Sequence, residues 1–427
     1  MIPTIESNVR GYCRSFPTTF CRAKGSQLVD EQGRSYIDFF SGAGALNFGH
    51  NHPALTSAVI DHISQDGLIH GMDMDTTIKR QFLNQFQTTI LNPRHQSYTI
   101  QFSGPTGTNA VEAAIRLARK VTGRSLVLGF THGYHGMTMG ALSLTANRYY
   151  RESASLLQHH AGFLPFDGYY GPEIDTIDLI KKQLDDPSSG LDLPAAIILE
   201  TIQGEGGINV ASTRWLNRLY QLTQDYGILL IVDDIQVGVG RTGQFFSFEQ
   251  TDLVPDIILL SKSISGLGLP LSLVLIKPDY DQWKPGEHTG TFRCNNLALV
   301  SATQSLLFWE DPAFHHHMQS VIDTLDHHLL GLHEQYPSLI KSIRGTGLIK
   351  GIEFHDPSVA QSIQHRAFNR GLIIETSGGH NHVLKLMPAL TIDLSLLTDG
   401  LTIINDCIQS VMTDAPHLAM STTMLSS

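Results

Sequence analysis

Two short apolar segments, close together in the chain, each lead into polar residues. Segment 228–232 reads Ile-Leu-Leu-Ile-Val and is followed by Asp233 and Asp234, and segment 257–260 reads Ile-Ile-Leu-Leu and is followed by Ser261 and Lys262. Unbroken apolar runs of this length are typical of strands buried on both faces of a parallel sheet. The carboxyl ends of such strands meet at one edge, where open α/β sheets bind their ligands. We therefore predict an α/β protein with an acid and a lysine at that edge.

An aspartate and a lysine at two strand ends, joined by a glycine-rich link over residues 238–243, indicate pyridoxal 5′-phosphate chemistry. The lysine forms a Schiff base with the cofactor, and the aspartate keeps the pyridine nitrogen protonated so that the ring withdraws electrons. A structural Asp–Lys pair without a cofactor is the alternative. For an isolated pair that alternative is the more frequent one, because short motifs often occur by chance.

The longer phrases around these two residues are more specific. IVDDIQVGVGRTG (231–243) and DIILLSKSISG (256–266) resemble the signature of the class III aminotransferases, the ornithine and GABA type. The resemblance runs from about residue 39 to about residue 390. It implies fold type I of the pyridoxal-phosphate-dependent transferases: a large domain with a mostly parallel seven-stranded sheet between helices, and a small α+β domain.

The resemblance also implies a domain division. We expect residues 1–55 to contribute to the small domain and the substrate entrance, 56–305 to form the large cofactor-binding domain, and 306–427 to form the small domain. At 427 residues the chain is long enough for two or three domains.

Four positions near the two strand ends take their expected roles from the resemblance. Lys262 binds the cofactor and, once freed, moves a proton; burial lowers the pKa of such a lysine, so it acts near neutral pH. Asp233 pairs with the pyridine nitrogen, and Gln236 contacts the phenolic oxygen of the ring. Asp234 stands where relatives carry glutamate, and it either orients Asp233 or is a plain strand-end residue.

A phosphate site is expected at residues 103–108, Ser-Gly-Pro-Thr-Gly-Thr, which precede a predicted helix over 109–123. Free N–H groups and the positive end of a helix bind phosphate, so Gly107 and Thr108 are the candidates. The resemblance adds Thr291, which would reach the phosphate of a neighbouring subunit. It therefore implies a homodimer, or a dimer of dimers, with active sites shared across the interface.

Residues 131–138 resemble the family's histidine, glycine and aromatic segment. The resemblance implies that Tyr134 stacks on the cofactor face opposite the substrate and that His135 belongs to the cofactor site. A metal held by His132 and His135 is the alternative. It is disfavoured because no acid or cysteine lies near them in the sequence, and no metal is expected.

Three charged residues are expected to act on substrates, and a fourth charged residue, an acid, is expected near the cofactor. Glu200 follows a predicted strand over 195–199 and by resemblance lies near the cofactor. Glu205 matches a glutamate that gates the substrate site and pairs with a C-terminal arginine, but this chain carries Lys385 there, which offers a point charge and not a bidentate fork. Arg293 either binds a substrate carboxylate or anchors its own loop.

Composition excludes several partners. The net charge of −11 and the absence of a Lys/Arg run argue against nucleic acid, and no apolar stretch approaches the roughly 20 residues that cross a bilayer. Residues 1–20 do not read as a secretory signal. The four cysteines lack CxxC spacing, which favours free thiols in a reducing cytoplasm; these are Cys13, Cys21, Cys294 and Cys407.

The remaining elements are predicted from the periodicity of apolar residues and from the turn-forming residues that bound them. We expect a β-hairpin over 26–40, a loop over 41–53, strands over 99–102, 125–130, 271–276, 343–354, 372–375 and 383–386, helices over 306–309, 314–334, 359–370 and 394–411, and a tail over 412–427.

The phrases at 260–278 and 283–296 are most similar to family members that move the terminal amino group of L-2,4-diaminobutyrate to 2-oxoglutarate. The expected products are L-aspartate 4-semialdehyde and L-glutamate, and the reaction is reversible. The alternatives are ornithine, N-acetylornithine, GABA or lysine as donor, or a mutase, racemase or decarboxylase of the same fold. Arg148 and Arg151 lie where 2-oxoglutarate would bind. The pathway, whether compatible-solute (ectoine), siderophore or diamine synthesis, stays open.

Overall fold

The computed structural model describes residues 5–152 and 160–414. Its largest sheet has seven strands in the order β4-β12-β11-β10-β7-β5-β6. Every neighbouring pair from β11 to β6 is parallel, and β12 alone runs antiparallel to both of its neighbours. The predicted mostly parallel seven-stranded sheet is therefore confirmed; its strands are β4 Thr99–Gly104, β5 Val127–Phe130, β6 Ala161–Leu164, β7 Ala196–Leu199, β10 Leu229–Asp233, β11 Ile257–Leu260 and β12 Ser272–Ile276.

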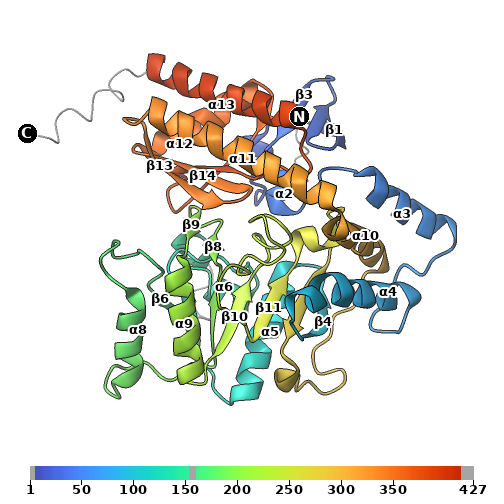
Figure 1. Ribbon diagram of the computed structural model, residues 1–427, viewed down its shortest axis with the longest axis vertical. Coiled ribbons are helices and arrows are strands. Elements are labelled where there is room, and N and C mark those ends of the chain that lie inside the picture. Colours follow the sequence, from blue (N-terminus) through green and yellow to red (C-terminus); the bar gives the residue numbers. More distant parts are fainter. Residues whose placement is uncertain (1–4, 153–159, 415–427) are drawn as a thin grey trace, which may run out of the picture.

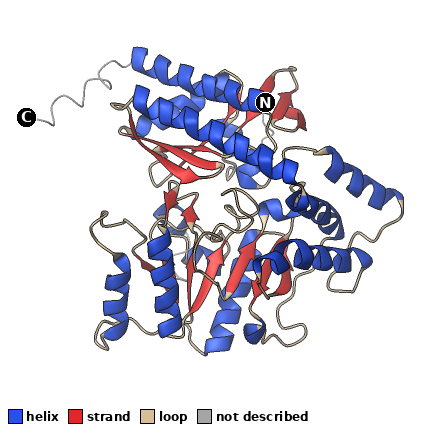
Figure 2. Cartoon of the chain, in the orientation of Figure 1, coloured by secondary structure: helices blue, strands red, loops and turns tan. Residues whose placement is uncertain are grey.

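Alternate residues of the central strands enter two different cores. Leu229 and Ile231 of β10 pack with α5 (Gly107–Thr122), whereas Leu230 and Val232 pack on the opposite face with α9 (Thr213–Asp225). Both faces of the strand are thus buried by helices, which is why its sequence is apolar at every position. Figures 1 and 2 show this sheet in the lower half of the molecule with helices around it.

The register of the central strands places their carboxyl ends together. Ile231 lies opposite Ile257, and Asp233, the last residue of β10, lies opposite Leu259. Lys262 follows the end of β11 by two residues. The fold therefore delivers the predicted acid and lysine to one edge of the sheet.

A second sheet, β13-β14-β17-β16, lies in the upper half of Figure 1 beneath three long helices. Its strands are β13 Ile340–Thr346, β14 Ile349–Phe354, β16 Glu375–Ser377 and β17 Val383–Leu386, and the helices are α11 Pro312–Gln335, α12 Pro357–Asn369 and α13 Leu394–Asp414. A third sheet joins strands from the first 40 residues to a C-terminal strand: β1 Phe20–Lys24, β2 Gln27–Asp30, β3 Ser35–Asp38 and β15 Leu372–Ile373. The exact domain boundaries at 55 and 305 stay a prediction.

Two expectations for the C-terminal part were wrong. Residues 343–354 are not one strand but parts of two antiparallel strands, β13 and β14. The turn between them is made by Gly347 and Leu348, and the φ of 59° at Gly347 suits glycine. Residues 372–375 are divided between β15 and β16, which belong to different sheets.

Most of the other expected elements are confirmed. The hairpin over 26–40 is β2 and β3, and the loop over 41–53 contains one short helical turn, α2 Ser41–Gly44. Residues 415–427, most of the expected tail, lie outside the described part. The further helices are α1 Tyr12–Ser15, α3 Pro53–Ser64, α4 Thr77–Phe86, α6 Met139–Ser143, α7 Arg148–Arg151, α8 Thr176–Asp185 and α10 Asn296–Leu306. Among the described residues, none of the helices is long and apolar enough to cross a bilayer.

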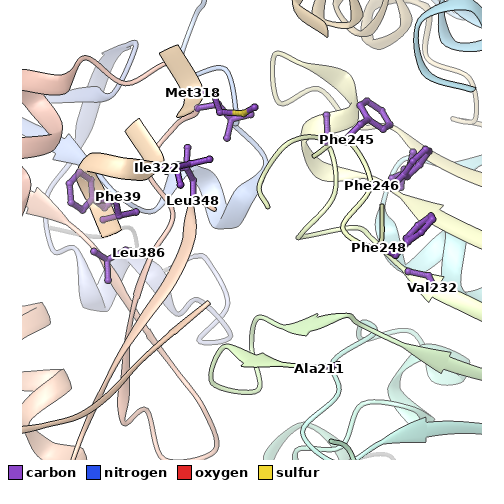
Figure 3. Close-up of a cluster of buried hydrophobic side chains, with 14 of the residues drawn as sticks. Phe39, Ala211, Val232, Phe245, Phe246, Phe248, Met318, Ile322, Leu348 and Leu386 are labelled. Atoms are coloured by element: carbon purple, nitrogen blue, oxygen red, sulfur yellow. The ribbon is translucent and has the colours of Figure 1, made fainter. Parts of the chain in front are cut away.

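One apolar cluster runs from the large sheet to the second sheet. Figure 3 shows Phe245 and Phe248 on one side and Phe39 and Leu386 on the other, and all four belong to this cluster together with Val232 of β10. Because a continuous close-packed core resists deformation, the two sheets hold the residues between them in fixed positions.

Candidate active site

The acid at the end of β10 is held by a histidine. His135 Nδ1 lies 2.7 Å from Asp233 Oδ2, and the backbone N–H of Ile235 donates to Asp233 Oδ1 at 3.3 Å. Both side chains are buried. Burial disfavours a charged imidazole, but the hydrogen bond and the charge of Asp233 together raise the pKa of His135. The pair therefore presents a carboxylate in one fixed orientation.

Lys262 has an unusual backbone. Its φ of 49° is left-handed, a conformation that costs a non-glycine residue on the order of 1–3 kcal/mol. The next residue holds the turn in place, because Ser263 Oγ donates to Gly44 O at 2.7 Å and accepts from the Asn47 N–H at 3.1 Å. Burial lowers the pKa of the Lys262 amine, opposed by the nearby carboxylate of Glu205. A strained, desolvated lysine of this kind is typical of functional sites.

The predicted phosphate loop opens helix α5, as expected. Gly107 is its first residue, and a Cβ added there would lie 2.9 Å from Ile235 Cδ1. Thr108 Oγ1 lies 2.5 Å from Thr138 Oγ1. Sixteen residues of helix direct the positive end of their dipole at this loop, so the geometry suits an anion.

Thr291 lies on an exposed loop before α10. Its neighbour Gly290 approaches the end of β4, where an added Cβ would be 3.7 Å from Ser103 O. Among the described residues Thr291 makes no hydrogen bond to Gly107 or Thr108. Its action across a subunit interface stays a prediction.

Glu200 fixes the loop that carries the predicted stacking residue. Its carboxylate accepts from the Tyr134 N–H at 2.9 Å and from the Gly204 N–H at 3.4 Å. Burial raises its pKa to about 7; the charge on His135 opposes this rise, and that on Asp233 adds to it. The stacking of Tyr134 on a cofactor stays a prediction, and its ring lies 5.7 Å from that of Tyr150.

Glu205 and Lys385 form an ion pair, and the role of this pair as a gate stays a prediction. Lys385 Nζ donates to Glu205 Oε1 at 2.8 Å, and Gln236 Nε2 donates to the same oxygen at 3.1 Å. Burial would raise the pKa of Glu205, but the charges of Lys385 and Lys262 prevail and lower it to about 2. Glu205 lies in the turn between β8 (Ile202–Gln203) and β9 (Asn209–Val210), strands that lie between the two larger sheets in Figure 1.

Three residues of this site were not predicted. Glu375 Oε1 lies 3.0 Å from Lys385 Nζ, and the phenols of Tyr12 and Tyr150 lie close enough for Glu375 and Glu205 to add to the burial-driven rise of their pKa values. Position 375 ends a predicted strand, which is a weak signal. No local pattern marks the two tyrosines.

Some candidate residues have other partners. Arg293 forms an ion pair with Asp73 at 2.9 Å and donates to Gly290 O at 2.7 Å, which favours the anchoring alternative; binding of a substrate carboxylate stays a prediction. Arg151 lies over the Phe163 ring, and Arg148 is exposed. Nothing in these contacts selects an arginine for 2-oxoglutarate.

Asp234 is hydrogen-bonded to the segment that follows the glycine-rich link. It is fully buried, and its Oδ2 accepts from the Ser247 N–H at 3.2 Å. Burial raises its pKa to about 7. This contact favours a role in supporting that segment, and an orienting role toward Asp233 stays a prediction.

Comparison with known proteins gives the family. A family model described as "Aminotransferase class-III" matches residues 11–408. The chain belongs to the class III aminotransferases. This class III chain is similar to two relatives named "Diaminobutyrate--2-oxoglutarate transaminase". The relative from Bordetella parapertussis is 53% identical, and the match covers 96% of this chain and 95% of the relative. The relative from Wolinella succinogenes is 52% identical, with the same coverage of both chains.

Solved structures agree with the class III assignment. The ornithine aminotransferase of Toxoplasma gondii is 25% identical, has a TM-score of 0.81, and covers 96% of this chain and 94% of its own. A Bacillus anthracis aminotransferase has a TM-score of 0.83 at 24% identity, over 95% of this chain and 96% of its own. The fold of this class III aminotransferase is therefore fold type I, as predicted.

Proposed function

We propose that this aminotransferase uses pyridoxal 5′-phosphate to move the terminal amino group of L-2,4-diaminobutyrate to 2-oxoglutarate. The products are L-aspartate 4-semialdehyde and L-glutamate, and the reaction is reversible. The observation that carries the choice of donor is the 52–53% identity, over 96% of the chain, with relatives that bear this name.

The residues present fit the cofactor. The edge of the large sheet offers an amine for an aldehyde at Lys262, a carboxylate for a pyridinium nitrogen at Asp233, and a helix N-terminus for a phosphate at Gly107 and Thr108. His135 Nε2 is buried and has no hydrogen-bond partner among the described residues, which leaves room at this edge for a further polar group. Among the described residues, no three His, Cys, Asp or Glu side chains form a group that could hold a metal ion.

Each of these residues has a separate role in the proposed reaction. Bound pyridoxal phosphate supplies an electron-withdrawing ring that stabilises negative charge beside the reacting amine. Asp233 holds the proton of the ring nitrogen, and His135 holds Asp233. The Lys262 amine, with its pKa lowered, accepts and returns a proton at the reacting carbon near neutral pH. Glu205 and Lys385 border the substrate side.

We also propose that the enzyme is a cytoplasmic homodimer whose sites are completed across the interface. Exposure of Thr291 beside the end of β4 supports this, because an exposed residue is available to a second subunit. The four cysteines are free thiols, which suits a reducing compartment.

The test is a single half-reaction. Purified enzyme loaded with the cofactor is mixed with L-2,4-diaminobutyrate alone, and one equivalent of aspartate 4-semialdehyde per site is expected. Later addition of 2-oxoglutarate should then give one equivalent of glutamate. Conversion of ornithine or GABA but not diaminobutyrate would refute the donor, and release of carbon dioxide would indicate a decarboxylase. Lys262→Ala is the inactive control.

A further inference from the structure

Lys385 is paired with two carboxylates, not one. In the antiparallel pairing of β16 and β17, Glu375 lies directly opposite Lys385, so their side chains project from the same face of the sheet. Lys385 Nζ lies 3.0 Å from Glu375 Oε1 and 2.8 Å from Glu205 Oε1. Two of these three side chains are buried, since Lys385 has no exposed surface and Glu375 is 5% exposed, whereas the Glu205 side chain is 28% exposed.

The charges of this cluster do not balance. Two ionised carboxylates around one ammonium leave a net charge of −1. Among the described residues, no other basic side chain forms an ion pair with Glu205 or Glu375. The Lys262 amine also acts on both carboxylates, but burial lowers its pKa, so a positive charge from a ligand would stabilise the cluster further.

The two carboxylates differ in how well their hydrogen bonds are satisfied. Glu205 Oε1 accepts from both Lys385 and Gln236. Glu375 Oε1 is buried and lies 3.0 Å from Lys385 Nζ, a cation that it shares with Glu205. A carboxylate can accept several hydrogen bonds, so Glu375, which shares its cation with Glu205, can accept a further donor from a ligand.

Glu375 acts on the same space as the catalytic lysine. Its charge opposes the burial-driven lowering of the Lys262 pKa, and it adds to the rise of the Tyr12 and Tyr150 pKa values. The Glu375 pKa itself is raised by burial to about 6, against the charge of Lys385, so that it is ionised at neutral pH. An ammonium group of a bound substrate would meet a carboxylate there.

We propose that Glu375 is a specificity-determining residue that receives the second ammonium group of the amine donor, the α-ammonium of a diamino acid. This inference rests on the proposed function and names the residue that recognises the amine donor. L-2,4-Diaminobutyrate and 4-aminobutyrate (GABA) carry the same reacting amine and the same carboxylate, and they differ only in that α-ammonium. A comparison of the two donors therefore measures the effect of the contact between Glu375 and the α-ammonium alone.

The test compares the two donors in the half-reaction of the holoenzyme. In Glu375→Gln, kcat/KM for L-2,4-diaminobutyrate is expected to fall about 10- to 100-fold, the range for a hydrogen bond to a charged group. The kcat/KM for GABA should stay level or rise, and the KM for 2-oxoglutarate should not increase. A parallel fall for both donors means a merely structural role, and it overturns the proposal, as does no change for either.

Two further variants make the result decisive. Glu353→Gln removes another buried carboxylate of the same sheet, one paired with Lys341 at 3.2 Å, and should leave the ratio of the two donors unchanged. If Glu375→Gln does not fold, Glu375→Asp keeps the charge but withdraws it by one methylene group. In this variant the ratio of kcat/KM for L-2,4-diaminobutyrate to kcat/KM for GABA should fall at least about threefold. An unchanged ratio overturns the proposal.

Failure of this inference is separable from failure of the proposed function. If the wild-type enzyme does not convert L-2,4-diaminobutyrate at all, the donor is wrong. If it does so and the Glu375 variants keep the wild-type preference over GABA, only the role of Glu375 is wrong.

Discussion

His135 Nδ1 lies 2.7 Å from Asp233 Oδ2, and neither side chain is exposed by more than 4%. The histidine is itself fixed, because its backbone N–H donates to Thr145 Oγ1 at 3.0 Å. An acid at the end of a central strand is thus oriented by a loop from a different βα unit. The pair acts as one unit toward a pyridinium nitrogen.

The His135→Leu variant should keep the fold but lose the orientation of Asp233. We expect kcat to fall about 10- to 100-fold, the value of a hydrogen bond to a charged group, with little change in KM for the donor. Steady-state kinetics checks this. His132→Leu, on the same loop but beside Tyr169, is the matched control and should keep kcat.

The Gly107→Ala variant should weaken cofactor binding. The added Cβ would lie 2.9 Å from Ile235 Cδ1, so either the isoleucine or the loop must move. We expect about a tenfold loss of affinity for pyridoxal phosphate, measured by absorbance titration of the apo-enzyme. Because Cδ1 is the end of a flexible side chain, Gly107→Ala with Ile235→Val should recover most of the affinity. Equal losses in both variants would contradict the steric cause.

The Lys385→Met variant should be markedly less stable. It leaves the buried Glu375 and the partly exposed Glu205 without their cation, and loss of the partner of a buried charge costs about 3–5 kcal/mol. Thermal and urea unfolding measure the loss, and Lys385→Met with Glu375→Gln should lose less because one charge fewer is stranded. Lys341→Met removes an ion pair from a half-exposed lysine and should change little.

The Asp234→Asn variant should change how stability depends on pH. Burial raises the pKa of Asp234 from 3.8 to about 7, so the folded state holds this proton more tightly than the unfolded state. The group's contribution to stability is present below about pH 4 and is lost as the pH rises toward 7. Asparagine has no proton to lose, so the variant should gain on the order of 2 kcal/mol over the wild type between pH 5 and pH 8. Unfolding curves at the two pH values test this, and Asp279→Asn, at an exposed position, should show no gain.

The large sheet could be predicted because its signals are local. Segments 228–232 and 257–260 are apolar at every position, since both faces of the strands are covered, and the residues after them stand at strand ends. Together with the family resemblance, this was enough to name Asp233 and Lys262 and to place the phosphate loop at Gly107. The prediction of one strand over 343–354 is wrong because the turn at Gly347 and Leu348 is only two residues long and lies within an otherwise strand-like run.

The surroundings of the site could not be predicted in the same way. The pairing of Glu375 with Lys385 depends on the register of β16 against β17, and the anchoring of Arg293 depends on Asp73, more than 200 positions earlier in the chain. Tyr12 reaches the site from a short N-terminal helix.

The sequence by itself determined the central strands, the acid and lysine at their ends, and the family. The tertiary structure alone decided which charges meet around Lys385 and how each is compensated. The reason is physical. The burial of a strand can be predicted from its own apolar residues, whereas a buried charge is compensated by whichever groups the fold brings within a few ångströms.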